Sequence, residues 1–187
     1  MLNYQSPIKE KTEYSGLIVK EISPIMKLNL RGKNKDFLST IGKNINMILP
    51  LEANTSSASD KYTSMWLSPD EWMVVSNNSI DKENNNYEIE EILFNKISKT
   101  NLGAISDVSD QFVLINLNGE KVFDLLSAGC PFNFNNFKTK KGAVAQTLLN
   151  QIDIIIHHKE LNNINLFVRR SFSEHLMSWI SDAASRL

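Results

Sequence analysis

The sequence predicts an α+β fold built from two related halves, each with the element order β-β-α-β-β-α. Two observations lead to this prediction. Short runs of β-branched and apolar residues alternate with amphipathic helical spacings along the 187 residues. One strand–glycine–helix joint also occurs twice, as LNLRG at 28–32 and INLNG at 115–119, and in both copies another glycine follows ten residues later, Gly42 and Gly129. A joint that recurs with the same spacing indicates an internal duplication.

The duplication sets the predicted domain organisation. We expect an N-terminal arm at 1–15 and a single domain at 16–187, in which the pseudo-repeats cover about 16–100 and 101–187. A chain of this length buries roughly two-thirds of the surface that its unfolded form exposes. No disulfide or structural metal is needed to stabilise it.

The first half is expected to contain two strands, a helix, a hairpin and a second helix. Their predicted positions are strands at 17–22 and 25–30, a helix through Phe37, Leu38 and Ile41 that ends at Gly42, a hairpin over 62–76 and a helix through Ile89–Ile97. Ser68-Pro69-Asp70 supplies the hairpin turn, because proline presets the turn dihedral. The polar stretches 52–61 and 77–87 read as solvated loops.

The second half repeats this order. Strands are predicted near 103–109 and 111–117, a helix at 120–128, strands near 145–150, 152–158 and 163–170, and a final helix. Ser171 and Glu174 have the spacing of a capping box at the start of that helix. The apolar pattern of 67–74 also matches that of 149–156.

Composition excludes several classes of function. The 20 Lys and Arg residues balance 21 Asp and Glu residues, so the chain lacks the excess positive charge of a nucleic-acid-binding protein. The single cysteine, Cys130, excludes an intrachain disulfide and suits a reducing compartment. No apolar run approaches the ~20 residues that span a membrane, and the polar N-terminus lacks a signal-peptide core. We expect a cytoplasmic protein without a membrane or nucleic-acid partner.

The duplicated joint is a weak candidate for a phosphate site. A phosphate cradle needs several free backbone N–H groups at a helix start, usually exposed by closely spaced glycines. Each copy has one glycine at that point, Gly32 or Gly119. A recurring structural corner is the better interpretation.

The remaining chemical groups do not form a recognisable catalytic or metal set. Cys130 precedes a proline and has no histidine nearby in sequence, so a buried core residue is expected. His157 and His158 are neighbours on a predicted strand and point to opposite faces, which prevents them from chelating one ion. His175 fits a boundary position of the last helix, and Asp107 and Asp110 fit turn or capping roles. We expect no catalytic, cofactor-binding or metal-binding residues in this chain.

Several stretches together resemble one known family. They are YQSPI at 4–8, WLSPDEWMVVS at 66–76, SAGCPFNF at 127–134, KKGAVAQTLLNQIDIIIHH at 140–158 and NLFVRRSFSEHLMSWISDAA at 165–184. They occur in the same order as in the gamma subunit of heterotetrameric sarcosine oxidase, over nearly the whole chain. The most specific elements are the Gly142-to-Thr147 motif and Arg170-Ser171-Phe172. Ser68 stands where the family more often has glycine, and Asn133 where aspartate is common, which puts roles of those two side chains in doubt.

A more distant resemblance concerns the fold. AISDVSDQFVLINLNGEKVFDLL at 104–126 is similar to a signature of the folate-binding aminomethyltransferase domain of the glycine cleavage system. That resemblance implies two ββα-based halves with exchanged strands, in agreement with the duplication. It does not imply folate binding, because a shared fold does not carry its site with it.

The gamma-subunit resemblance implies membership of a four-subunit flavoenzyme. Such an enzyme oxidises sarcosine to glycine, reduces oxygen to peroxide and forms 5,10-methylenetetrahydrofolate. The implied cofactors are FAD, FMN, NAD, tetrahydrofolate and zinc, all held by the alpha, beta or delta subunits. The gamma chain is implied to hold none and to pack mainly against alpha.

A packing role predicts an interface centred on aromatic and arginine side chains, which are enriched among the residues that dominate binding energy. The candidates are Trp66, Trp72, Arg169, Arg170 and Trp179. Arg169 and Arg170 are adjacent on a predicted strand and therefore face opposite sides.

Two specific alternative functions stay open, beside that of a generic adaptor protein. A related N-methylamine enzyme such as N-methylglutamate dehydrogenase has similar small subunits, and the gamma sequence does not select the amine substrate because the substrate binds elsewhere. A free-standing folate-binding protein is the other alternative, and it requires that the isolated chain binds tetrahydrofolate.

Overall fold

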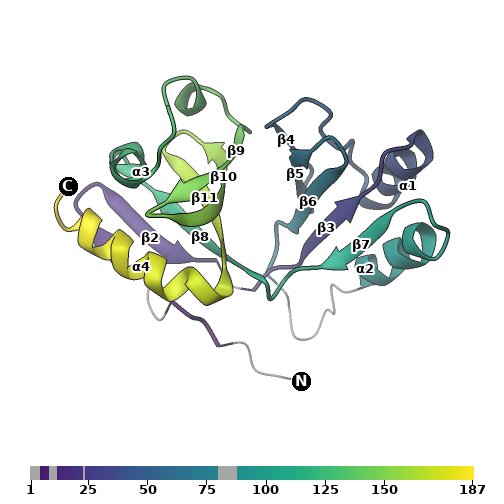
Figure 1. The fold of residues 1–187 in the computed structure, drawn as a ribbon, viewed down its shortest axis with the longest axis horizontal. Helices are drawn as coiled ribbons and strands as arrows, with labels where there is room; N and C mark the ends of the chain where they lie inside the picture. The colour runs from purple at the N-terminus through teal and green to yellow at the C-terminus, as the bar shows by residue number, and fades with distance from the viewer. Residues whose placement is uncertain (1–4, 9–11, 23, 80–87) are drawn as a thin grey trace. The chain divides into compact units, whose positions relative to one another are not determined.

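The computed structural model describes residues 5–8, 12–22, 24–79 and 88–187, and these form two antiparallel sheets with helices against them (Figure 1). The strands are β1 (Thr12–Tyr14), β2 (Leu17–Glu21), β3 (Lys27–Arg31), β4 (Ser56–Ala58), β5 (Tyr62–Ser68), β6 (Glu71–Ser76), β7 (Ala104–Asp107), β8 (Phe112–Asn118), β9 (Val144–Leu149), β10 (Ile152–Glu160) and β11 (Asn163–Arg169). The helices are α1 (Lys35–Ile45), α2 (Glu88–Leu93), α3 (Val122–Gly129) and α4 (Arg170–Ala184), with a π-helical turn η1 (Phe94–Ser98) and a 3-10 turn η2 (Phe137–Thr139). The predicted α+β class is confirmed. None of the described helices is long and apolar enough to cross a membrane.

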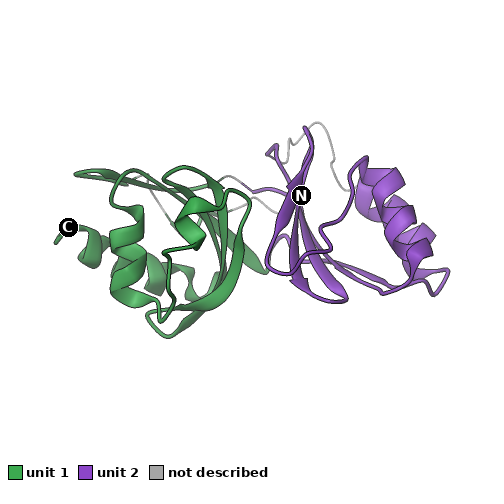
Figure 2. Ribbon diagram, turned by 90° about the horizontal axis from the view of Figure 1, so that it is seen from above, with its two compact units in different colours: residues 1–23, 111–187 green, residues 24–110 purple. Residues whose placement is uncertain are grey.

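The chain divides into two compact units, coloured separately in Figure 2. Unit 1 comprises residues 1–23 and 111–187. Its described strands form a sheet in the order β1-β2-β8-β11-β10-β9. Helices α3 and α4 cover one face of this sheet and bury Leu125 and Leu176, which are both 0% exposed. The core of unit 1 therefore lies between one sheet face and two helices.

Unit 2 comprises residues 24–110 and has the same plan. Its described strands form a sheet in the order β4-β5-β6-β3-β7. Helix α1 buries Phe37, Ile41 and Ile45 against this sheet, which explains the helical spacing of these apolar residues. Trp72 on β6 is 2% exposed and lies with its ring centroid 6.1 Å from that of Phe37.

The two sheets share one topology, and each contains a strand from the other half of the sequence. Read from one edge, the orders β2-β8-β11-β10-β9 and β7-β3-β6-β5-β4 correspond strand for strand. The first strand of each half is the exchanged one, since β2 pairs with β8 and β7 pairs with β3. The duplication predicted from the sequence is thus visible as matching topology, whereas the compact units do not follow the predicted sequence limits of about 16–100 and 101–187.

Each half has three strands between its helices; all three were predicted in the second half, whereas the first half has one strand that was not predicted. In the first half this strand is β4, which lies inside the stretch 52–61 predicted as a loop and pairs with β5. By sheet position the β5–β6 hairpin therefore corresponds to β10–β11, so the predicted match between 67–74 and 149–156 is wrong by one strand.

The N-terminal residues are partly described. Strand β1 pairs with β2, so the described part of the predicted arm 1–15 contains a strand, and Ile8 is buried in the core of unit 1. Residues 1–4 and 9–11 of that arm, and 80–87 of the predicted loop 77–87, lie outside the described residues. Whether 16–187 behaves as a single domain stays a prediction.

Two helix ends differ from their predicted positions. Helix α1 continues through Gly42 to Ile45 and ends at Asn46, whose φ of 50° gives the left-handed conformation that was expected of glycine. Helix α4 begins at Arg170, one residue before the predicted cap Ser171, and no side chain caps it. The capping-box prediction is therefore wrong. Strand β11 runs directly into the helix, which leaves no room for a separate cap residue.

Candidate functional site

The strand–glycine–helix joint of unit 1 is closed by the chain itself. The Gly119 N–H donates to the Asn162 carbonyl at 2.9 Å, and the Lys121 N–H donates to the Gly16 carbonyl at 3.1 Å. In unit 2 the Gly32 N–H donates to the Asp70 carbonyl at 3.1 Å. A phosphate cradle requires such N–H groups to be free. These bonds support the interpretation of the joint as a recurring structural corner.

Cys130, the candidate nucleophile, is a buried residue at the end of α3. Its side chain is 8% exposed and belongs to the core of unit 1. Burial raises the pKa of the Cys130 thiol to about 12, because a thiolate is poorly solvated there. The predicted core role of Cys130 is confirmed.

A thiol reagent should therefore detect Cys130 only after unfolding. At pH 8 we expect the native chain to react with a disulfide reagent roughly a thousandfold more slowly than the urea-unfolded chain, since the thiolate fraction and access both fall. The release of coloured thiol measures the rate. A native rate within tenfold of the unfolded rate would contradict the burial of this side chain.

His157 and His158 are both buried on β10. His158 Nδ1 lies 3.0 Å from the Phe137 carbonyl and 2.9 Å from the Lys140 carbonyl, so this nitrogen must carry the proton and donate. The Phe137 ring stacks on the imidazole of His158 with a centroid distance of 5.6 Å. His158 therefore fastens the 3-10 turn η2 to the sheet, and the described residues contain no cluster of three or more potential metal ligands.

His157 should make the chain less stable in mild acid. Burial, with a smaller effect of His158, lowers the pKa of His157 from 6.5 to about 4. The unfolded state therefore takes up a proton at a higher pH than the folded state, and stability falls as the pH drops from 6.5 towards 4. Because of His157, we expect the free energy of unfolding to fall by about 2 kcal/mol when the pH is lowered from 7.5 to 5.

Urea titrations at the two pH values check this expectation. His157→Gln should remove most of the difference, whereas His175→Gln, at an exposed position on α4, should leave it unchanged. An equal pH dependence in wild type and His157→Gln would refute the assignment.

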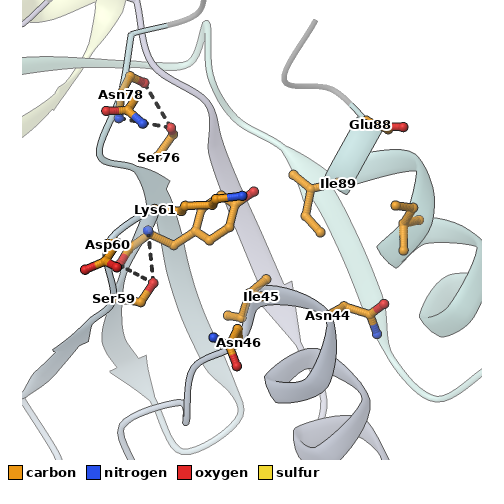
Figure 3. Close-up of a pocket in the computed structure, with 12 residues that line it drawn as sticks. Asn44, Ile45, Asn46, Ser59, Asp60, Lys61, Ser76, Asn78, Glu88 and Ile89 are labelled. Carbon is orange, nitrogen blue, oxygen red and sulfur yellow. Dashed lines mark hydrogen bonds between the residues drawn. The ribbon is translucent and has the colours of Figure 1, made fainter. Parts of the chain in front are cut away.

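A polar hollow of about 670 Å³ lies in unit 2 between the end of α1, strands β5 and β6, and α2 (Figure 3). Much of its polar wall is already bonded within the chain. The Asn44 amide donates to the Thr40 carbonyl at 2.6 Å and accepts from Lys96 Nζ at 2.8 Å, and the Ser76 hydroxyl donates to the Asn78 carbonyl at 2.9 Å. These bonds engage groups that a polar ligand would need.

A smaller hollow of about 370 Å³ in unit 1 contains one of the predicted interface residues. Arg169 lines it together with Phe112, its partner in the β8–β11 register, and Asp153. Gln146 and Thr147, from the motif most specific for the resembled family, line the same hollow. The structure thus brings together an exposed arginine, an aromatic ring and two motif residues that are far apart in sequence.

The other predicted interface residues do not form one surface within either unit. Trp66 and Trp72 are directly opposite in the β5–β6 register and so share a face, but Trp72 is buried in the core. Trp179 packs beside Gly129, and the Arg170 guanidinium donates to the Gln5 carbonyl. Partner contacts of these residues stay a prediction, and for Trp72 the burial means that any such effect is indirect.

Sequence reasoning missed a segment that presents large apolar side chains to solvent. Ile48 is 83% exposed and Leu51 is 67% exposed, both directly after α1. The letters MILPL at 47–51 show an unbroken apolar run, which gives no sign of which side chains face outward.

Comparisons with known proteins identify one family model that matches most of the chain. The model of the family described as "Sarcosine oxidase, gamma subunit family" matches residues 31–186. A comparison with curated protein sequences gave no match.

Two solved structures share the fold. A chain of heterotetrameric sarcosine oxidase from Corynebacterium sp. U-96, in complex with pyrrole 2-carboxylate, superposes with a TM-score of 0.81 at 19% identity over 95% of this chain and 88% of that chain. Aminomethyltransferase T of the glycine cleavage system from Bartonella henselae superposes with a TM-score of 0.63 at 14% identity, over 91% of this chain and 49% of that chain. The predicted resemblance to the aminomethyltransferase fold is confirmed.

Proposed function

Because the chain belongs to the sarcosine oxidase gamma subunit family, we propose that it is the non-catalytic gamma subunit of a four-subunit, flavin-dependent sarcosine oxidase. The family match over residues 31–186 is the observation that carries the proposal. The complex converts sarcosine to glycine and forms peroxide and 5,10-methylenetetrahydrofolate. In this proposal FAD, FMN, NAD, tetrahydrofolate and zinc bind to the alpha, beta and delta subunits, and this chain packs mainly against alpha.

The state of the chain's reactive groups supports a non-catalytic role. The Cys130 thiol is buried with a raised pKa, and His158 is held by two backbone carbonyls. The Gly32, Gly119 and Lys121 N–H groups at the two strand–glycine–helix joints are bonded within the chain. A nucleophile or general base needs access to its substrate, which these groups lack.

A supporting subunit can still affect the chemistry of its complex. Oxidation of an N-methylamine gives an imine, which water hydrolyses. If this chain holds a folate-type domain of alpha in place, it keeps closed the path along which the imine reaches tetrahydrofolate. Loss of the chain should then release more free formaldehyde per sarcosine oxidised.

Native mass spectrometry tests the proposal directly. The chain is co-expressed with the products of the genes adjacent to its own, and the purified complex is weighed intact and again after denaturation. A one-each assembly that carries flavin is the expected result. A chain that stays alone in the presence of these partners would overturn the subunit role.

The same samples separate the two alternatives. Turnover of N-methylglutamate in place of sarcosine by the assembly would indicate a related N-methylamine enzyme. A gain of one tetrahydrofolate mass by the isolated chain would indicate a free-standing folate-binding protein.

A further inference from the structure

The outer side of α1 is a shallow surface between two lysines. Phe37, Ile41 and Ile45 occupy the buried side of the helix. The opposite stripe contains Lys35 and Lys43 at spacings that place them on one side of the helix, with small and apolar residues between them.

The segment at 47–51 forms the second wall beside this stripe. Its side chains face both the core and the solvent: Met47 is 9% exposed, Ile48 83%, Leu49 3% and Leu51 67%, and Pro50 is buried. The outer stripe of α1 and this segment enclose a groove of about 710 Å³, which we call the α1 groove. Two large aliphatic side chains thus border a groove instead of lying singly on the surface.

The segment is held in this position by specific bonds. The Ser57 hydroxyl donates to the Ile48 carbonyl at 2.6 Å, and Trp72 Nε1 donates to the Pro50 carbonyl at 2.7 Å. The Met47 N–H donates to the Gly42 carbonyl at 3.1 Å and continues the end of α1. The outward direction of Ile48 and Leu51 is therefore imposed by the fold. Exposed apolar side chains on a fixed scaffold are typical of a protein–protein interface.

The charge of the α1 groove indicates which side chains a partner surface would carry. Lys35 and Lys43 line the α1 groove, and no acidic side chain lines it within the described residues. Neither lysine forms an ion pair with another described residue, whereas Lys33 nearby pairs with Asp70 at 3.7 Å. A complementary surface would therefore carry carboxylates on both sides of an apolar centre.

We propose that the α1 groove docks a partner subunit through a segment with aliphatic side chains flanked by Asp or Glu residues. The aliphatic side chains contact Ile48 and Leu51, and the carboxylates pair with Lys35 and Lys43. This assignment rests on the proposed function, because membership of a subunit family implies a partner with a matching surface. Trp72, a predicted interface residue, then acts by positioning this segment from the core.

Two kinds of variant test the groove in the co-expressed complex. Ile48→Ser combined with Leu51→Ser removes the apolar contact, and Lys35→Glu combined with Lys43→Glu reverses the charge. Each pair should weaken assembly by about tenfold or more, measured as the midpoint of dissociation on dilution of the purified complex. The charge-reversed pair should also reverse the salt dependence of the association rate, because salt then screens a repulsion between the groove and the partner's carboxylates.

Leu161→Ser is the matched control, because Leu161 is 79% exposed and lies in the β10–β11 turn of unit 1. The isolated variants should melt within a few degrees of wild type, since the changed side chains are exposed. If the wild type assembles and both groove variants assemble equally well, the inference is overturned and the subunit role is left intact. Wild type that does not assemble overturns the subunit role itself. Concentration-dependent self-association of the isolated wild type, abolished by the groove variants, would instead assign the groove to a second copy of this chain and overturn the proposed partner.

Discussion

Gly119→Ala is expected to lower the free energy of unfolding by about 3 kcal/mol or more. Gly119 has a φ of 136°, a region that residues with a Cβ rarely adopt. A Cβ at this position would also overlap the Gly16 carbonyl oxygen and lie 3.0 Å from the Leu17 Cα. Both obstacles are backbone atoms at the entrance of β2, so no side-chain rotation relieves them.

Urea unfolding followed by circular dichroism measures this effect, and Gly42→Ala is its control. Gly42 lies inside α1, where a Cβ would be 3.1 Å from the Met47 carbonyl oxygen. Alanine there stabilises the helix by about 1 kcal/mol through its higher helix propensity, and the close contact opposes this gain. We therefore expect the free energy of unfolding to change by less than about 1 kcal/mol. Equal midpoints for the two variants would show that the corner at Gly119 tolerates a side chain.

Trp72→Ala should destabilise the chain by about 3–5 kcal/mol. The indole is 2% exposed, packs beside Phe37 and donates its N–H to the Pro50 carbonyl. Truncation leaves a cavity in the core of unit 2 and an unpartnered carbonyl in the segment that borders the α1 groove. Trp72→Phe retains most of the ring volume, so its cost should be about 1–2 kcal/mol, the value of the lost hydrogen bond and imperfect packing.

Trp66→Ala is the control for Trp72→Ala, because it removes a tryptophan that is not in the core. Trp66 lies opposite Trp72 in the hairpin register but is only half-buried. Its replacement should cost clearly less than that of Trp72. Circular dichroism is the suitable probe, because each variant changes the fluorescence signal itself. If Trp66→Ala lowers the free energy of unfolding more than Trp72→Ala does, Trp72 is not the main packing residue of unit 2.

Local patterns predicted most strands and helices because their signals lie within a few residues. Pro69 and Asp70 set the turn between β5 and β6, and the LNLRG and INLNG joints fall at the ends of β3 and β8. The exchanged pairing of β2 with β8 was implied only by the resemblance to the aminomethyltransferase fold. Strand pairing depends on contacts about a hundred residues apart, and a local period carries no information on them.

The errors have local physical causes. Strand β4 is three polar or small residues long, too short for an alternation to be seen. Asn46 ends α1 because asparagine tolerates the left-handed conformation nearly as well as glycine, so Gly42 was the wrong choice between two acceptable stops.

The candidate interface was less predictable than the fold. Tryptophan and arginine were chosen for their general frequency at binding hot spots, but Trp72 forms part of the core. Ile48 and Leu51 lie in the apolar run 47–51, whose other three residues are buried. Their outward direction is fixed by bonds from Ser57 and Trp72, which are distant in sequence and leave no trace in the local pattern.

The strand exchange also orders events during synthesis. Unit 2 consists of residues 24–110 and can close once that stretch has left the ribosome. Strands β1 and β2 are synthesised before unit 2, yet β8, the neighbour of β2 in the sheet, follows only at 112–118, and α4, which packs on the same core, follows later still. Strands β1 and β2 therefore precede unit 2 in synthesis but enter their sheet only after unit 2 can fold.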